Sequence, residues 1–542
     1  FFILFYFLSI LQLYSFSPLS DEQALPPLPP PASQGFLSSI VLLKCHLTNS
    51  CYFCADVTVA PINDSSDSAI ANNKREHYDC FQLPLSEDGY MPYQRIRTLM
   101  AAVDKLSPSD NDAVGVALQT LGSKLVSMQS WGYPSNGSEA IVNDPLLGEL
   151  FQIMARSASD TDITAKRDNL PFKQTFLAKS AKAEHFLDVA GNHVLIGSEA
   201  KGVEKSHFHA FPQAFQVCGD SVLNLYGAGL QREDCVVPGL VVAGESLKIV
   251  AVYLMAECFP VVVEISSYLS LFSMSGQEQI ARWLVALSRF AVETAELLRA
   301  PGKLPRTISR ITLSSKLFFK PIRNCKKPEV TLRTERDTSS CRSALHRVMH
   351  MYKTLSGVEL AERFVLFPVG ALCLPNEDNA FASDLRRFLV NKINVHFKDW
   401  ETIHPPLLVF PLLDSGWTNG KVPSDYIADY KQNAQMIVTM LNAAGIAHMD
   451  LRPQNIMWKV TNGHLECQLI DLEDAVYFGH FVTHLKTLRE DARYPVNPRD
   501  TRDYVRADSR ANDWFLSAII AYMDSERYHE ESFSFSDFMR LN

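Results

Sequence analysis

A loop near the C-terminal end decides the fold of this chain, and it reads His448-Met449-Asp450-Leu451-Arg452-Pro453-Gln454-Asn455. Just before the loop, apolar residues recur at three- and four-residue steps from Ile427 to Ala444, the spacing of a buried helical stripe. Ser424 is a favourable N-cap for this helix, and Gly445 ends it in the C-cap role. The pattern therefore predicts a buried helix that leads the chain directly into the loop.

A hairpin is predicted directly after the loop. Residues 456–469 contain two strand-like runs around Asn462-Gly463, a pair favoured at type I′ turns. The return strand runs straight into Asp471. The hairpin is therefore expected to bring Asp450, Asn455 and Asp471 to one end of the same small structure.

These three side chains are the kind that phosphoryl transfer needs. One carboxylate must orient the attacking hydroxyl and accept its proton, while a second carboxylate and an amide oxygen hold the magnesium ions that bridge the phosphates. Magnesium prefers hard oxygen ligands and keeps several waters, so two protein ligands are enough. The loop and the hairpin together therefore predict a magnesium-dependent phosphotransfer site.

The loop resembles the catalytic loop of protein kinases, which reads His-Arg-Asp-x-x-x-x-Asn. His448, Asp450 and Asn455 stand at that spacing. The resemblance implies that ATP is the phosphate donor, that Asp450 is the catalytic base, and that Asn455 and Asp471 bind Mg²⁺. Arg452 stands where the family usually has Lys, near the transferred phosphate, which implies a catalytic role for it too.

Two flanking segments agree with this resemblance, and a third departs from it. His404–Pro411 resembles the strand that leads into the adenine-binding hinge. Asn512-Asp513-Trp514 resembles the Asp-x-Trp element of the helix that supports the catalytic loop, which implies that Asp513 anchors backbone N–H groups of the loop. Asp471-Leu472-Glu473 replaces the Asp-Phe-Gly of protein kinases, so the metal-binding aspartate is kept and the aromatic residue is lost.

The other lobe of the kinase-like domain, which is predicted over residues 303–542, is less clear in the sequence. Its first part contains no Gly-x-Gly-x-x-Gly loop. Lys320 is the best match for the lysine that pairs with the phosphates, and Glu329 and Glu335 are the alternatives for its partner. A helix predicted over Leu345–Leu355 is the candidate element to carry that glutamate.

The middle of the chain has its own pattern. Leu146, Leu147, Leu150, Phe151 and Met154 stand at helical spacing. Runs rich in Val and Ile follow, and a long amphipathic helix closes the block; these elements are predicted at 193–196, 239–242, 247–253, 260–265 and 277–299. The order of elements predicts an α+β multidomain protein.

One strand of this block carries charged residues. Glu199 and Lys201 project from the same face of the strand, and Asp188 precedes Glu199 by eleven residues. Two carboxylates and a lysine at a strand end can hold a divalent ion and position a water for attack on a phosphodiester. Asp188 and Glu199 are therefore candidate metal ligands, with Glu199 and Lys201 as catalytic residues. A solvated, salt-bridged strand face is the alternative.

This set resembles the PD-(D/E)xK nucleases. The resemblance implies a restriction-endonuclease-like α/β domain over residues 136–302, with a further glutamate at Glu149 and a glutamine at Gln213 or Gln216. A nuclease-like domain followed by a kinase-like domain is similar to the C-terminal regions of Crinkler-type proteins. That similarity implies an effector that acts inside cells, in a nucleus, and that contacts nucleic acid through the middle domain.

The remaining sequence gives weaker signals. The net charge of −9 predicts no global attraction to nucleic acid or to a membrane, although a basic stretch from Lys316 to Lys327 is either a local patch or a linker. Eleven scattered cysteines indicate reduced thiols in an intracellular protein. Cys51, Cys54, His77 and Cys80 are either a zinc set or a chance grouping.

Residues 1–35 are an apolar and then Pro-rich segment, and residues 36–135 receive no functional assignment. The apolar run, Phe1–Phe16, is short for a membrane span. It is similar to the core of a signal peptide, but no Lys, Arg or initiating Met precedes it, so a truncated gene start is the alternative. No membrane association is expected of the folded part.

Three functions compete at this point. The first is an ATP- and Mg²⁺-dependent kinase, acting on Ser or Thr of a protein substrate and fused to a nuclease-like module. The second is a metal-dependent DNA endonuclease with a regulatory pseudokinase domain. The third is a non-catalytic interaction protein, which the missing Gly-rich loop favours.

Overall fold

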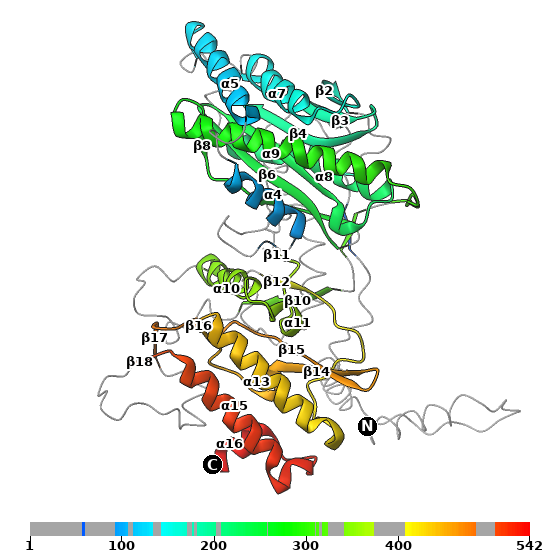
Figure 1. The fold of residues 1–542 in the computed structure, drawn as a ribbon. Helices are drawn as coiled ribbons and strands as arrows, with labels where there is room; N and C mark the ends of the chain where they lie inside the picture. Colours follow the sequence, from blue (N-terminus) through cyan, green and yellow to red (C-terminus); the bar gives the residue numbers. More distant parts are fainter. Residues whose placement is uncertain are drawn as a thin grey trace, which may run out of the picture. The chain divides into compact units, whose positions relative to one another are not determined.

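The computed structural model describes fourteen segments of the chain, and all structural statements below concern these segments. They are residues 57–59, 91, 93–106, 112–133, 142–170, 176–177, 182–201, 207–256, 258–308, 311–313, 317–322, 341–372, 407–483 and 504–541. Figure 1 shows the helices and strands that they form. In these segments no helix is both long enough and apolar enough to cross a membrane.

The middle domain is built on one mixed sheet. Its main path runs in the order β2-β3-β4-β5-β6-β7, and a short strand, β8, also pairs with β6. Neighbouring strands are antiparallel except for β4 and β5, which are parallel and are connected through helix α8. The bounds are Ile163–Asn169 (β2), Lys182–Val189 (β3), His193–Lys201 (β4), Val236–Ala243 (β5), Ser246–Ala256 (β6), Phe259–Glu264 (β7), Leu269–Ser270 (β8) and His207–Gly227 (α8).

Helices cover both faces of this sheet. His185 of β3 packs against Phe151 of α7 (Gly148–Ala158), with ring centroids 6.2 Å apart. The next residue, Phe186, packs against Val217 of α8. Because successive side chains on a strand point to opposite faces, α7 and α8 lie on opposite sides of the sheet. Helix α9 (Met274–Arg299) packs on α7, on the side opposite α8.

The predicted elements of this domain are present, and two further helices join it. The residues expected on a helix from Leu146 to Met154 are all buried, in α7 and in the π-helical turn Val142–Leu147 that precedes it. Helices α4 (Gln94–Lys105) and α5 (Asp112–Ser130) come from the range that the sequence left unassigned, and both pack on α9. Their buried stripes, such as Leu121 and Leu125 of α5, supply the apolar contacts.

The C-terminal domain begins with a small lobe. A three-stranded antiparallel sheet has the order β10-β12-β11, with bounds Leu317–Pro321, Leu407–Pro411 and Gly370–Leu372. Helices α10 (Cys341–Ser356) and α11 (Ala361–Phe364) accompany it. The strand expected from His404 to Pro411 is confirmed as β12, whose first four residues are buried. A separate two-stranded pair joins β1 (Val57–Val59) to β9 (Ile311–Leu313).

The second lobe contains the predicted helix, loop and hairpin. Helix α13 spans Ile427–Ala443, and Gly445 beyond its end has the left-handed φ of 65° that suits a terminating glycine. The N-cap prediction at Ser424 is wrong: Ser424 begins a 3₁₀ turn that runs into the helix. The hairpin is confirmed as β14 (Ile456–Thr461) and β15 (His464–Leu469). Asn462 and Gly463 both have positive φ, as a type I′ turn requires.

Short strands and two helices complete this lobe. Strand β13 (Ile446–Ala447) pairs with β16 (Val476–Tyr477), and β17 (Phe481–Thr483) pairs with β18 (Tyr504–Arg506). Helices α15 (Ser509–Asp524) and α16 (Phe535–Leu541) follow. Between them, the ring of Tyr522 contacts the rings of Tyr528, Phe533, Phe535 and Phe538.

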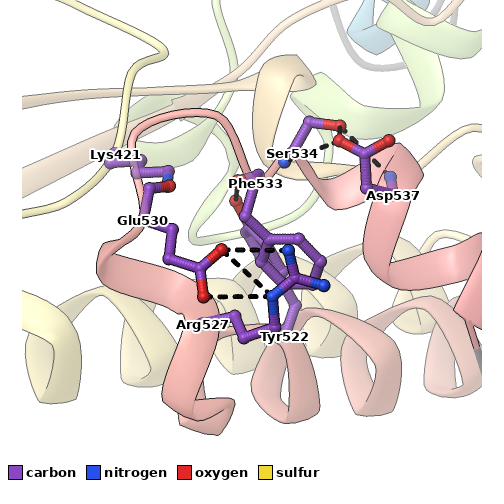
Figure 2. A network of polar contacts seen from close by, with 7 residues as sticks. All are labelled: Lys421, Tyr522, Arg527, Glu530, Phe533, Ser534 and Asp537. Atoms are coloured by element: carbon purple, nitrogen blue, oxygen red, sulfur yellow. Dashed lines mark hydrogen bonds and ion pairs between the residues drawn. The ribbon is translucent and has the colours of Figure 1, made fainter.

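Polar contacts close the end of the lobe, as Figure 2 shows. Arg527 pairs with Glu530, and Lys421 donates to the backbone carbonyl of Glu530. The Tyr528 hydroxyl accepts a hydrogen bond of 2.8 Å from the backbone N–H of Val422. The loop before α13 is thus bonded to the turn after α15.

Candidate active site

The loop at His448 is held by an asparagine on the supporting helix. The side-chain oxygen of Asn512 accepts a hydrogen bond of 2.9 Å from the backbone N–H of His448, and its amide donates to the carbonyl of Ile446 at 2.7 Å. Asn512 is fully buried. Because a buried amide left unpaired would be costly, these bonds fix the start of the loop relative to α15.

The role predicted for Asp513 is therefore wrong, because Asn512 has it. The Asp513 side chain is exposed, and its Oδ1 accepts a hydrogen bond of 3.3 Å from the side chain of Asn442. The signal for Asn512 was in the sequence. It occupies the same buried stripe of α15 as Phe515 and Ile519, and a polar residue on an apolar stripe needs a buried partner.

Asp450 lies at the centre of the loop. Its Oδ1 accepts from Nε of Arg452 at 2.7 Å, and its Oδ2 accepts from Nδ2 of Asn455 at 3.1 Å. The same amide donates to the backbone carbonyl of Asp450 at 2.8 Å. Burial raises the pKa of Asp450 to about 6, although Arg452 and Asn455 act against the rise. A carboxyl with this pKa is mostly ionised at neutral pH and can still accept a proton efficiently.

Asp471 follows the return strand of the hairpin and has a φ of 67°. The backbone N–H of Ile470 donates to the carbonyl of Asn455 at 2.9 Å, which places Asp471 beside the end of the catalytic loop. Its carboxylate pairs with Lys320 and accepts from the N–H of Glu473 at 3.2 Å. Burial acts to raise the pKa of Asp471, but Lys320, His448 and the N–H of Glu473 together outweigh burial, so this pKa lies below its ordinary value and the group stays ionised.

His448 contributes structure to this site. Its ring is fully buried, and burial lowers the pKa of His448 to about 4, against the opposing effect of Asp471. The ring is therefore neutral at physiological pH. A neutral imidazole adds no positive charge that would compete with a metal ion at Asp471.

The structure brings together Asp450, Arg452, Asn455, Asp471 and Lys320, the five residues predicted for this site. Lys320 comes from β10, in the other lobe, and its pairing with Asp471 joins the two lobes at the site. The alternatives for its partner, Glu329 and Glu335, lie outside the described residues, as do the basic residues Lys316, Arg323, Lys326 and Lys327. Neither glutamate is on α10, which begins at Cys341 and contains no Asp or Glu.

These five side chains are chemically suited to bind Mg²⁺ together with a nucleoside triphosphate. Asp471 is ionised and Asn455 offers an amide oxygen, so each supplies the hard oxygen that Mg²⁺ prefers. No group of three or more His, Cys, Asp or Glu within the described segments could hold a metal by itself. Two protein ligands completed by phosphates and waters are the arrangement expected for Mg²⁺ at a nucleotide. Lys320 and Arg452 provide the positive charge that phosphates need.

The middle domain brings together only part of its predicted set. Nζ of Lys201 lies 2.5 Å from Oε1 of Glu199, and both side chains are nearly buried. Asp188 is elsewhere: it pairs in register with Val194, and its carboxylate accepts from Thr164 at 2.6 Å and from Lys166 at 2.8 Å. With a rise of about 3.3 Å per residue, the five residues from Val194 to Glu199 separate the two by roughly 16 Å. The grouping of Asp188 with Glu199 and Lys201 is therefore wrong.

Glu184 takes the place that Asp188 was expected to have. The β3–β4 register continues from Leu187 opposite Ile196 to Ser198, whose hydroxyl donates to the carbonyl of His185 at 2.7 Å. This register sets Glu184 opposite Glu199, and Oε2 of Glu184 accepts from the N–H of Ala200 at 3.0 Å. Counting back symmetrically from the turn at 190–192 would set Ala183 opposite Glu199. The register shift between Leu187 and Asp188, which no pattern in the sequence marks, moves the pairing by one residue to Glu184.

The glutamine and the glutamate expected on helices near this site have different surroundings. Gln213 lies one turn before Val217 on α8, the helix that packs against Gly197, and its Oε1 is buried without a hydrogen-bond partner. Gln216 is buried as well. Glu149 lies 3.6 Å from Arg156 on its own helix, α7, on the opposite side of the sheet from α8. The candidate zinc residues Cys51, Cys54, His77 and Cys80 lie outside the described residues.

Comparisons with known proteins bear on the C-terminal domain alone. Residues 424–477 match the family described as lipopolysaccharide kinase (Kdo/WaaP) family. Nothing among the curated proteins matches the chain, and no solved structure matches it. The matched range begins at the turn before α13 and ends with β16. The C-terminal part of the chain is thus kinase-like over the segment that carries Asp450, Asn455 and Asp471.

Proposed function

We propose that the C-terminal domain transfers the γ-phosphate of ATP, with Mg²⁺, to a hydroxyl group, and that this hydroxyl belongs to Ser or Thr of a protein. The observation that carries the proposal is the adjacency of Asp450, Asn455 and Asp471, with Lys320 and Arg452 beside them. The match to a kinase family over the same segment supports it.

Each residue has a step in the proposed reaction. The acceptor oxygen forms a bond to the γ-phosphorus while the bond to the β-phosphate oxygen breaks and ADP leaves, and Asp450 takes the acceptor proton. Arg452 and Lys320 place their positive charge on phosphate oxygens. Asn455 and Asp471 would hold Mg²⁺, which supplies neutralisation of charge on the phosphates when bound.

The acceptor class is tested with the full chain and ATP labelled on the γ-phosphate. One arm offers a protein mixture rich in Ser and Thr, and a second offers lipopolysaccharide, after which the matched family is named. We expect Mg²⁺-dependent labelling of protein that survives acid and is lost in alkali, because alkali eliminates phosphate from Ser and, more slowly, from Thr. Labelling of the carbohydrate alone would replace the protein acceptor, and no labelling in either arm would favour a non-catalytic interaction protein.

A second candidate function, metal-dependent DNA cleavage, is proposed for the middle domain. It is favoured by the order of elements, a helix, three strands, a helix and a parallel strand, which is typical of PD-(D/E)xK nucleases. Glu184, Glu199 and Lys201 meet on the sheet face that α8 covers, where the buried Oε1 of Gln213 still has a lone pair to offer. Under this proposal the kinase-like domain regulates cleavage.

Replacing Lys201 by Met is expected to lower Mg²⁺-dependent DNA cleavage by about a hundredfold or more, because the attacking water loses its polarising cation. Lys166→Met is the matched control, since Lys166 also pairs with a carboxylate on a strand, Asp188. Asp188 lies near the opposite end of β3 from Glu184. Cleavage rates are measured on plasmid DNA over a Mg²⁺ series. Equal losses in both variants, or no cleavage by the wild-type chain, would contradict the nuclease proposal.

A further inference from the structure

Tyr477 connects three parts of the candidate active site. It lies in β16, six residues after Asp471, and its backbone is paired with Ile446 of β13. Strand β13 leads directly into His448, and the N–H of Phe478 donates to the carbonyl of Gly445 at 2.7 Å. Any displacement of β16 is therefore passed on to the start of the catalytic loop through these backbone bonds.

The hydroxyl of Tyr477 reaches the opposite lobe. It lies 2.6 Å from Nδ1 of His350 and 2.9 Å from Oγ1 of Thr354, which are one turn apart on α10. The rings of His350 and Tyr477 also meet edge to face, with centroids 5.7 Å apart. A tyrosine hydroxyl has one proton to donate and two lone pairs to accept with, so it can satisfy both partners at once.

A second contact runs parallel to this one. Arg347, one turn earlier on α10, donates to the backbone carbonyl of Glu473 at 3.2 Å. Helix α10 is therefore hydrogen-bonded to the segment after Asp471 at two points, Glu473 and Tyr477. It contains no Asp or Glu, so the helix itself cannot offer a carboxylate to Lys320, and Lys320 pairs with Asp471.

We propose that Tyr477 is a positioning residue whose hydroxyl holds α10 against the segment that carries Asp471, and so sets the magnesium-binding geometry of the site. The proposal rests on the proposed phosphotransfer function. Tyr477 is half-buried, and its hydrogen bond with Thr354 is partly buried, which limits competition from water for that bond, whereas the bond with His350 is exposed. Burial also raises the pKa of Tyr477, against the effect of Thr354, so the hydroxyl keeps its proton at physiological pH.

The test compares four forms of the full chain: wild type, Tyr477→Phe, His350→Ala and the double variant. Phosphate transfer is measured over a Mg²⁺ series at saturating ATP. We expect the Mg²⁺ concentration for half-maximal rate to rise about fivefold in Tyr477→Phe, because the partly buried hydrogen bond with Thr354 and the exposed one with His350 are both lost. The double variant is expected to be no worse than the worse single variant, because both changes remove the same contact.

Tyr426→Phe is the matched control, because Tyr426 is a partly buried tyrosine in the turn Ser424–Tyr426 that precedes α13. It should leave the Mg²⁺ dependence unchanged. An unchanged Mg²⁺ dependence in Tyr477→Phe, or strictly additive effects of His350→Ala and Tyr477→Phe, would overturn the positioning role while leaving the phosphotransfer proposal intact. An inactive wild-type chain that also fails to bind Mg·ATP would instead remove the phosphotransfer proposal, and the positioning role with it.

Discussion

Asp450→Asn is expected to lower phosphate transfer by about a hundred- to ten-thousandfold, the range that general-base catalysis typically contributes. Asparagine keeps the shape of the side chain but cannot accept the acceptor proton. The ligands proposed for magnesium, Asn455 and Asp471, remain, so binding of Mg·ATP should persist. The measurement is the initial rate of γ-phosphate transfer, with nucleotide binding followed in parallel.

The pH dependence gives this prediction a sharper form. Because the pKa of Asp450 is raised to about 6, the fraction of the ionised base increases through that pH. The rate should therefore fall as pH drops below about 6 and level off above it. Asp513→Asn is the matched control, since Asp513 is an exposed aspartate of the same lobe; it should keep both rate and pH profile. A full rate in Asp450→Asn would contradict the role of base.

Asp471→Asn is expected to abolish the Mg²⁺-dependent part of ATP binding. A ligand that binds only the folded state at a hundred times its dissociation constant stabilises it by about 2.7 kcal/mol, and the variant should lose most of this gain. The low pKa of Asp471 keeps it ionised, so the wild-type stabilisation should be constant across the neutral range. Thermal unfolding of the full chain with ATP, with and without Mg²⁺, measures the difference.

Asp414→Asn controls for the loss of an aspartate that pairs with a lysine. Asp414 lies 2.8 Å from Lys459 in the same lobe. Asp414 belongs to the loop after β12, and Lys459 belongs to the outer part of the hairpin, in β14. This variant should keep the full Mg²⁺-dependent stabilisation. If Asp471→Asn kept it as well, Asp471 would not be the metal ligand, and the carboxylates of Glu473 and Asp474 would be the next to test.

In the C-terminal domain, the features that the sequence predicts correctly are mostly those set by the spacing of nearby residues. The helix α13, the hairpin and its Asn462-Gly463 turn are short-range structures, in which spacing and turn chemistry determine the result. The three residues around the loop then follow from chain geometry. The pairing of Lys320 with Asp471 spans 151 residues, so only the kinase resemblance, and no local pattern, could point to it.

The errors come from register and from choices between neighbours. Asp188 was grouped with Glu199 by separation in sequence, but the hairpin register, which shifts between Leu187 and Asp188, places Glu184 there instead. The family pattern has an aspartate in this element and so points to Asp513, whereas the buried stripe of α15 favours Asn512. Helices α4 and α5 join the middle domain through contacts with α9 that no local pattern encodes.

The central claim is that Asp450, Asn455 and Asp471 form one phosphotransfer site. It is tested most directly by following γ-phosphate from labelled ATP in the wild-type chain, Asp450→Asn and Asp471→Asn under identical Mg²⁺. The account predicts transfer by the wild type alone, with Mg·ATP binding kept in Asp450→Asn and lost in Asp471→Asn. Transfer that survives in both variants, or a wild-type chain that neither binds Mg·ATP nor transfers phosphate, would contradict it.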